Sequence, residues 1–367
     1  MDRIKKLSKI IVNHSIKVKE NDKVLITYMS NDAEYFIKCL VQDIIDNKGI
    51  PTVKYNNPEL EELVKSNLND NIIENKKNIL KFEIDEYDSF IQIHSNLSDY
   101  FDRKTDTKLN NKMKETLKPY KDILVNKRHW VLLNYPSIVD AYKAKMTYDE
   151  FFNFAMDVMT VDYDKMYNDM LPLKELMEKT DKIRIVAKDT DISFSIKGLP
   201  AIICAGESNI PDGEVFTAPI KDSVNGIITY NTPSPYNGYV YHNVSLTFKD
   251  GKIIECHASE NEDKLEELFN TDEGSRYVGE FSFGLNPKIM NPMGDILFDE
   301  KIAGSIHFTP GSAYEECDNG NKSKIHFDMV LIQRPEYGGG EIYLDDVLVR
   351  KDGKFVLPEL EKLNYDD

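Results

Sequence analysis

The first half of the chain alternates between apolar residues at helical spacing and short continuous apolar runs. Ile4, Leu7 and Ile11 repeat at the spacing of one helix face, which predicts a helix over 4–17. The run KVLITYM over 23–29 is typical of a strand buried on both faces. Strands that alternate with helices in this way predict an α/β domain with a mostly parallel sheet. The other elements of this half are predicted as helices over 33–47 and 59–66 and strands over 52–55, 89–94 and 130–134.

The pattern changes after a helix predicted over 162–179. From there the chain consists of short apolar segments interrupted by Gly, Pro and Asn, which are typical of strands joined by turns. A length of 367 residues also favours two hydrophobic cores over one. We therefore expect an α/β domain over 1–180 and a β-rich α+β catalytic domain over 181–367. The second domain is predicted to contain a helix over 261–270 and strands over 184–188, 192–198, 226–231, 238–248, 252–258, 305–308, 324–332 and 341–350.

Composition narrows the classes of partner. The chain carries 46 Lys and Arg against 63 Asp and Glu, a formal net charge of −17, which repels nucleic acid and anionic membrane surfaces. No uncharged apolar run is long enough to span a bilayer. We therefore expect a cytoplasmic protein with no nucleic-acid and no membrane partner. The four cysteines form no CxxC pair, which favours reduced thiols over a zinc knuckle or redox motif.

One histidine stands out because an aspartate follows it two positions later. His326 and Asp328 lie in the predicted strand over 324–332, where residues two apart share a face. The imidazole and the carboxylate would project side by side while Ile325 and Phe327 pack behind them. The pair could bind a metal ion, or it could be an ordinary hydrogen-bonded His and Asp. The sequence pattern alone does not distinguish these two roles.

Two glutamates in apolar settings extend this set. Glu214 begins an apolar segment after a Pro/Gly turn, and Glu280 lies between Val278 and Phe281. Buried carboxylates need partners, and metal ions are one kind. With Asp328 the glutamates supply three negative charges, which two divalent ions and one hydroxide would balance to about neutral. Imidazole and carboxylate ligands without thiolate fit Zn, Co or Mn.

Four segments, in this order along the chain, resemble the signature segments of the aminopeptidase T family of dinuclear metallopeptidases, which are of leucyl-aminopeptidase type. The resemblance spans about residues 200–330 and is looser over the N-terminal half, where VKENDKVLITY and HWVLLNYPS are similar to the family's α/β domain. The four segments are NIPDGEVFTAP, TDEGSRYVGEF, ILFDEKIAGSIHFTPGSAY and GNKSKIHFD.

The resemblance implies a ligand set and a reaction. Glu280 would bridge two divalent ions, one held with Glu214 and His307 and the other with His326 and Asp328. The family's reaction is the release of the N-terminal amino acid from peptides, usually by a homodimer. Peptides are therefore the expected substrates and a homodimer the expected assembly.

The resemblance also implies two catalytic residues. Tyr314, seven residues after His307, matches the family's active-site tyrosine and would donate a hydrogen bond to the oxyanion of the tetrahedral intermediate. Glu300 is a candidate proton shuttle for a water activated by the two metal ions, although its spacing to His307 is wider than in bacterial members. Alternatively, Glu300 is a surface residue in a turn and Tyr314 simply packs.

Two other functions compete with hydrolysis. His307, His326 and Asp328 alone would form the two-histidine, one-carboxylate triad of an iron(II) ring-cleaving dioxygenase on the same scaffold. Glu214 and Glu280 argue against this interpretation, since a single iron needs no further carboxylates. A third possibility is an acidic protein in which the same residues bind a structural ion without catalysis.

Overall fold

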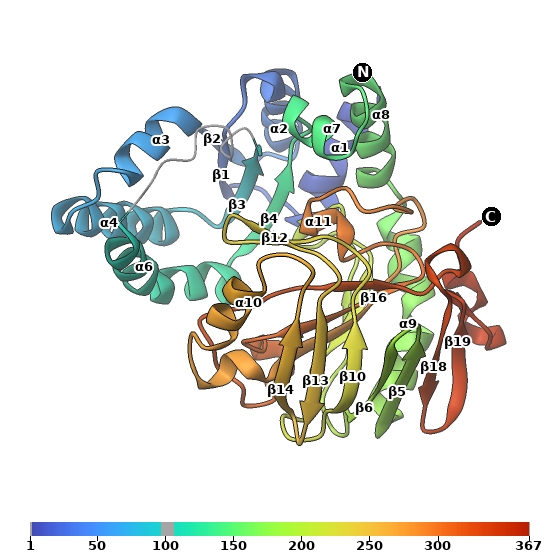
Figure 1. Cartoon of the computed structure of the whole chain (residues 1–367). Helices are drawn as coiled ribbons and strands as arrows, with labels where there is room; N and C mark the ends of the chain where they lie inside the picture. The colour runs from blue at the N-terminus through green and yellow to red at the C-terminus, as the bar shows by residue number, and fades with distance from the viewer. Residues whose placement is uncertain (1, 97–105, 367) are drawn as a thin grey trace. The chain divides into compact units, whose positions relative to one another are not determined.

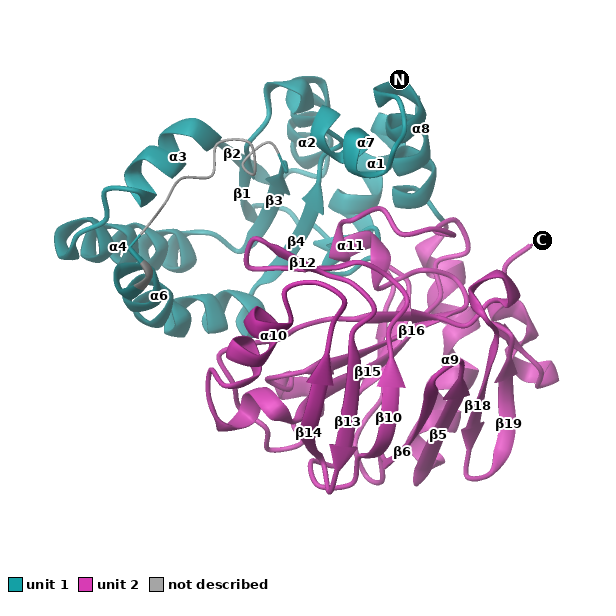
Figure 2. Ribbon diagram, in the orientation of Figure 1, with its two compact units in different colours: residues 1–161, 206–211 teal, residues 162–205, 212–367 magenta. Residues whose placement is uncertain are grey.

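The fold is described from a computed structural model, which describes residues 2–96 and 106–366. The chain divides into two compact units (Figure 2). Unit 1 comprises residues 1–161 and 206–211, and unit 2 comprises 162–205 and 212–367. The helix over 163–179 belongs to unit 2, and not to the first domain as expected, because it packs against strands of that unit. None of the described helices has the length and apolar character needed to cross a membrane.

Unit 1 contains the parallel sheet that the sequence predicts (Figure 1). Its strand order is β2-β1-β3-β4-β8, and every neighbouring pair is parallel. The strands are β1 (Lys23–Tyr28), β2 (Ile50–Tyr55), β3 (Ser89–His94), β4 (His129–Asn134) and β8 (Asn209–Ile210). The helices are α1 (Asp2–Ile10), α2 (Glu34–Asp46), α3 (Pro58–Lys65), α4 (Asp70–Glu86), α6 (Thr107–Lys127), α7 (Ile138–Lys143) and α8 (Tyr148–Met159).

Side chains on both faces of this sheet are buried. Leu25 and Phe90 are paired across β1 and β3, and they pack with Ile84 of α4 and Leu124 of α6. Val24 and Ile26, which point to the opposite face, are fully buried, and α1 and α2 lie on that side (Figure 1). The first domain is therefore an α/β layer structure with a parallel sheet, as predicted.

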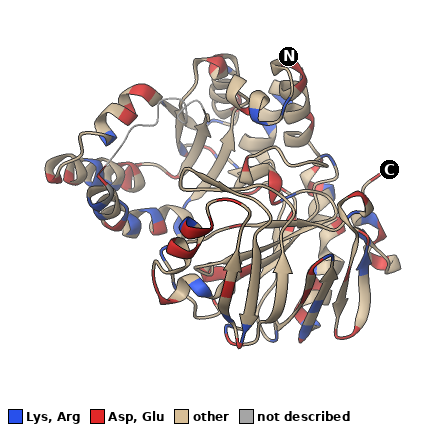
Figure 3. Cartoon of the chain, viewed as in Figure 1, with Lys and Arg blue, Asp and Glu red and all other residues tan. Residues whose placement is uncertain are grey.

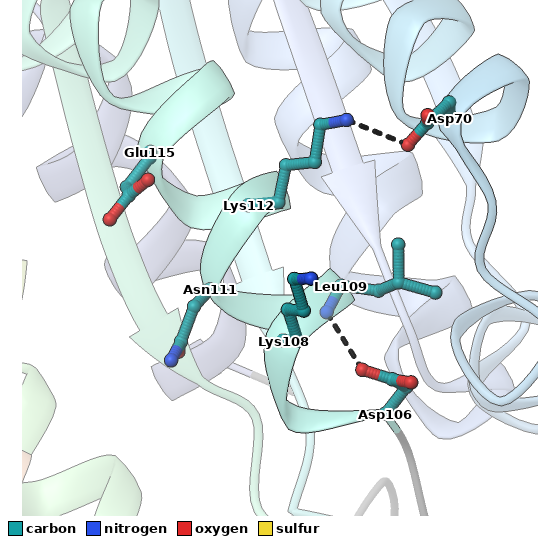
Figure 4. A pocket seen from close by; sticks show the side chains of 7 residues that line it. All are labelled: Asp70, Asp106, Lys108, Leu109, Asn111, Lys112 and Glu115. Atoms are coloured by element: carbon teal, nitrogen blue, oxygen red, sulfur yellow. Dashed lines mark hydrogen bonds and ion pairs between the residues drawn. The ribbon is translucent and has the colours of Figure 1, made fainter.

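Helices α4 and α6 contain residues of both signs of charge (Figure 3). The ends of the two helices border a polar hollow (Figure 4), in which Lys112 pairs with Asp70 at 2.8 Å. Asp106 accepts the Leu109 N–H at 2.9 Å and so begins α6. None of the predicted site residues lines the hollow.

Unit 2 is built from antiparallel strands, which confirms the β-rich second domain. One sheet has eight strands in the order β14-β13-β10-β6-β5-β18-β19-β20, and another has five in the order β17-β16-β15-β9-β7. The eight-stranded sheet consists of β5 (Lys182–Ala187), β6 (Thr190–Ser195), β10 (Asn225–Thr229), β13 (Ser245–Lys249), β14 (Lys252–His257), β18 (Gly340–Leu344), β19 (Val347–Lys351) and β20 (Lys354–Phe355). The five-stranded sheet consists of β7 (Ile202–Cys204), β9 (Glu214–Thr217), β15 (Val278–Gly284), β16 (Ser305–Pro310) and β17 (Val330–Ile332). The remaining elements of the unit include the hairpin of β11 (Ser234–Tyr236) and β12 (Tyr239–Tyr241) and the helices α9 (Tyr163–Lys179), α10 (Glu262–Phe269) and α11 (Ile296–Asp299).

Aromatic side chains fill the space between these two sheets. Phe281 of β15 and Phe308 of β16 each contact Phe194 of β6, with ring centroids 5.1 Å apart in both pairs. Phe248 of β13 meets Phe308 at 5.9 Å. One face of the five-stranded sheet is thus committed to the hydrophobic core, and its other face is available for polar groups.

Three strands predicted in unit 2 differ from those observed. The predicted strand over 238–248 is divided into β12 and β13, which belong to different sheets, and Asn243 between them has a positive φ. The predicted strand over 324–332 is regular only from Val330 to Ile332, because residues before it pair loosely with the segment after β16, as in the isolated bridge between His326 and Gly311. The predicted strand over 341–350 is a hairpin of β18 and β19, which turns at Asp345 and Asp346, both with positive φ.

Candidate metal centre

The register of the five-stranded sheet gathers the polar residues on one face. Ser282 of β15 pairs with His307 of β16, and Gly284 pairs with Glu214 of β9. Directly paired residues of antiparallel strands project to the same side, and so do residues two apart. Glu214, Glu280, Ser282 and His307 therefore share the face opposite the phenylalanine core.

Three of these side chains form what we call the inner subsite, Glu214, Glu280 and His307. The Nε2 atom of His307 lies 3.1 Å from Oε1 of Glu280 and 3.4 Å from Oε2 of Glu214. The three side chains are between 1% and 7% exposed. Ser282 donates to Oε2 of Glu214 at 2.9 Å and so fixes the carboxylate.

The outer subsite consists of Glu280, His326 and Asp328. The Nε2 atom of His326 lies 3.2 Å both from Oε2 of Glu280 and from Oδ1 of Asp328. Thr309 of β16 donates to the same Asp328 oxygen at 2.7 Å. His326 and Asp328 are 25% and 16% exposed, so the outer subsite is the more accessible of the two.

Backbone carbonyls orient both imidazole rings. Nδ1 of His307 lies 3.2 Å from the Glu300 carbonyl oxygen, and Nδ1 of His326 lies 2.9 Å from that of Ser312. A carbonyl oxygen can only accept, so each Nδ1 carries the proton and each Nε2 is directed at Glu280. Histidine ligands of metal ions are held in this way.

The chemistry of the donor atoms fits two divalent ions. In each subsite one atom from each of three side chains lies within 4.8 Å of the other two, and Glu280 contributes to both subsites. Carboxylate and imidazole donors suit Zn, Co or Mn. The residues predicted as ligands, from four separate segments of sequence, are thus brought to one place, with Glu280 common to both subsites.

The protonation of the metal-free cluster shows how strongly it favours positive charge. Burial alone would lower the pKa of His307, but its hydrogen bond to Glu280 and the charge of Glu214 raise it to about 10. The pKa of His326 is likewise raised against the effect of burial, by the charge of Asp328. Burial opposes ionisation of Asp328, yet the same ion pair holds its pKa well below the usual range. Without metal ions, protons on the two histidines offset two of the three carboxylate charges.

A buried lysine, which the sequence motifs do not indicate, adjoins the inner subsite. Lys301 is fully buried, forms an ion pair with Glu300 and places Nζ 3.6 Å from Oε1 of Glu214. Burial alone would lower its pKa, but the charges of Glu300, Glu214 and Asp212 raise the pKa well above its usual value. Lys301 is therefore charged.

Both predicted catalytic residues lie beside the cluster. The side chain of Glu300 is 14% exposed, so it is mostly enclosed, and burial raises its pKa to about 7 despite the opposing charge of Lys301. Tyr314 is 46% exposed, and its ring contacts those of His326 and Phe216 at centroid distances of 4.9 and 5.7 Å. Desolvation of its hydroxyl and the charge of Glu280 raise the pKa of Tyr314, so the hydroxyl keeps its proton and can donate.

Comparison with known proteins points to one family. The model of the thermophilic metalloprotease family M29 matches residues 1–355. The chain is 37% identical over 127 residues to aminopeptidase AmpS of Bacillus subtilis (strain 168), covering 34% of the chain and 30% of that protein. It is 35% identical over 164 residues to aminopeptidase 2 of Geobacillus stearothermophilus, covering 40% and 37%. The matched region spans about a third of the length of these curated relatives.

A solved structure shares the fold. The structure of wild-type AmpT from Thermus thermophilus superimposes with a TM-score of 0.81 and covers 97% of this chain and 99% of that chain, at 17% sequence identity. The fold similarity therefore extends over nearly the whole chain, well beyond the segments with recognisable sequence identity.

Proposed function

The chain belongs to the M29 family of metalloproteases, and we propose that it is an aminopeptidase that releases the N-terminal residue of peptides with two divalent metal ions. The observation that carries this proposal is the pair of donor triads that share Glu280. A single ion would not use both triads. Two ions across one carboxylate are the arrangement that suits hydrolysis of a peptide bond.

The roles of the residues follow from their positions. Glu214 and His307 would hold one ion, His326 and Asp328 the other, and Glu280 both. Ions bound there supply Lewis acidity and lower the pKa of a bound water. Tyr314 keeps its phenolic proton and donates a hydrogen bond to the oxygen of the scissile carbonyl as negative charge develops. Glu300, with a pKa of about 7, accepts a proton from the attacking water and returns it to the leaving amine.

The alternatives account for fewer residues. An iron(II) dioxygenase would use His307, His326 and Asp328 and leave Glu214 and Glu280 buried without a role. A purely structural ion would not require a half-exposed tyrosine beside the more accessible subsite. The family match and the relatives named aminopeptidase also give the dioxygenase no support.

Peptide digestion with a blocked substrate tests the proposal. Metal-free protein is loaded with Co²⁺, Mn²⁺ or Zn²⁺ and incubated with a short peptide and with its N-acetylated form, and the products are identified by mass spectrometry. Stepwise loss of residues from the free N-terminus, with the acetylated peptide intact, is the expected result. Internal cleavage, or iron-dependent oxygen uptake without cleavage, would contradict the proposed activity.

Assembly and location are further parts of this proposal. The resemblance to the peptidase family supports a homodimer, and the chain's negative charge supports peptides over nucleic acid as substrates. Light scattering coupled to size-exclusion chromatography measures the first, and a mass of one chain would contradict it. Fractionation of cells tests the proposed cytoplasmic location.

A further inference from the structure

Lys301 is unusual because lysine side chains are rarely buried completely. Its Nζ atom contacts Glu300 and lies 3.6 Å from Oε1 of Glu214. The negative charge of Asp212, which is 1% exposed, also favours the protonated form of Lys301. Removing an ammonium group from water is unfavourable unless negatively charged partners compensate for the lost hydration. The lysine thus lies among three carboxylates that are brought together from two distant parts of the chain.

The two oxygens of Glu214 have different partners. Oε2 accepts the hydrogen bond of Ser282 and lies 3.4 Å from Nε2 of His307, so it faces the inner subsite. Oε1 is directed toward Lys301. A metal ion of the inner subsite would therefore meet one oxygen of Glu214 and not both.

The donor atoms on the far side of Glu214 could otherwise attract a cation. Cys204, Asp212 and Glu214 each place a metal-type donor atom within 4.8 Å of the others, and Cys204 pairs with Glu214 across β7 and β9. Lys301 already supplies positive charge to the carboxylates of this group. The cation on this side of Glu214 is therefore the ammonium group of Lys301.

We propose that Lys301 is a fixed cation of the metal centre, which restricts Glu214 to one metal-facing oxygen and lowers the affinity of the inner subsite for its ion. The inference rests on the proposed two-metal site but not on its reaction. A positive charge next to a ligand carboxylate withdraws negative charge from the metal and repels the ion, most strongly where water is excluded. Lys301 is thus a positioning residue that acts through Glu214.

The direction of the effect separates this role from a structural one. If Lys301 merely supported the site, its replacement would disorder Glu214 and weaken metal binding. If it acts as a fixed cation, replacement by an uncharged residue of similar length frees Oε1 and removes the repulsion, so the inner ion binds more tightly.

The test uses the full chain with a His326→Ala substitution, which removes the imidazole of the outer subsite. The ion that this variant still binds is therefore assigned to the inner subsite. The Co²⁺ dissociation constant is measured by chelator competition for this parent and for added Lys301→Met, Lys301→Arg and Lys288→Met changes. Lys288 is an exposed lysine of unit 2, so Lys288→Met is the matched control. Lys301→Gln, which can still donate hydrogen bonds to the carboxylates, guards against a folding failure of Lys301→Met.

We expect Lys301→Met to bind Co²⁺ about tenfold more tightly or better because the repulsion is removed, and Lys301→Gln to change affinity in the same direction. The cobalt d–d bands should weaken as Glu214 coordinates through both oxygens and the coordination number rises. Lys301→Arg and Lys288→Met should bind as the parent does. Unchanged or weaker binding in folded Lys301→Met or Lys301→Gln overturns the inference, as does a parent that binds no ion. A protein that binds both ions without cleaving peptides would instead contradict the proposed function alone.

Discussion

Oε2 of Glu280 lies 3.2 Å from Nε2 of His326. The other oxygen of this carboxylate lies 3.1 Å from Nε2 of His307, so Glu280 faces one histidine with each oxygen. The side chain is held at the centre of the cluster by the register of β15 and β16. A single carboxylate therefore connects the two subsites.

Replacement of Glu280 by Ala should remove both ions together. The bridge serves each subsite, and the variant also leaves two histidines without their shared anion. We expect metal content near zero by inductively coupled plasma mass spectrometry and no detectable release of N-terminal residues. Glu315→Ala, at an exposed glutamate of unit 2, is the control. Near-normal turnover in Glu280→Ala would rule out the bridging assignment.

The two hydroxyl residues that hold the carboxylates should affect different subsites. Ser282→Ala removes the donor to Glu214, and Thr309→Val removes the donor to Asp328. Loss of such a supporting hydrogen bond typically costs about 10- to 100-fold in metal affinity. We expect Ser282→Ala to weaken the inner ion and Thr309→Val the outer ion, as measured by calorimetric titration. Equal weakening of both ions by both variants would show that the subsites are not held separately.

Metal uptake should depend on pH because ions and protons compete for the same histidines. With a pKa of about 10, His307 is protonated in the metal-free chain at neutral pH and must lose its proton to bind an ion. Each displaced proton makes the apparent affinity rise about tenfold per pH unit. Titrations between pH 6 and 8 in buffers of different ionisation enthalpy measure this release, and a pH-independent affinity would contradict it.

The same shift has a consequence for the stability of the metal-free chain. The folded-state pKa of His307 lies above the unfolded value of about 6.5. Its contribution to the free energy of unfolding is therefore fully present below about pH 6.5 and is lost as the pH rises through about 10. His307→Gln should flatten this part of the pH dependence in urea denaturation. An unchanged slope would mean that His307 is not protonated in the folded state.

Tyr314→Phe tests the proposed oxyanion contact. Loss of one such donor typically lowers kcat by about 10²- to 10³-fold. Because the ring that contacts His326 is kept in Tyr314→Phe, metal content should stay at the wild-type level. Tyr239→Phe, at an exposed tyrosine of unit 2, is the control. An unaffected kcat would leave Tyr314 a packing residue.

Around His326 and Asp328 the sequence predicted the alternation of side chains but not the extent of the strand. His326 and Asp328 do project to one side while Ile325 and Phe327 are buried on the other, as alternation requires. The regular strand nevertheless begins only at Val330. Residues 325–328 pair with the segment after β16, in which the Ser312 N–H donates to the Ile325 carbonyl. The alternation of apolar residues does not indicate which segment a strand pairs with.

Two other features could not be predicted, for different reasons. Helices α4 and α6 bury few side chains, so the helical spacing of their apolar residues is weak. Lys301 looks like one of many surface lysines in the sequence, because the carboxylates of Asp212 and Glu214 that stabilise it lie almost ninety residues earlier. Charged partners that are distant in sequence become neighbours only in the folded chain.

The central claim is that two ions share Glu280 and that both are needed for peptide hydrolysis. Its most direct test is a titration of the metal-free protein with Co²⁺, in which bound metal and release of an N-terminal amino acid are followed together. We predict that activity rises to a plateau at two ions per chain. Full activity at one ion per chain, or without any bound metal, would contradict the account.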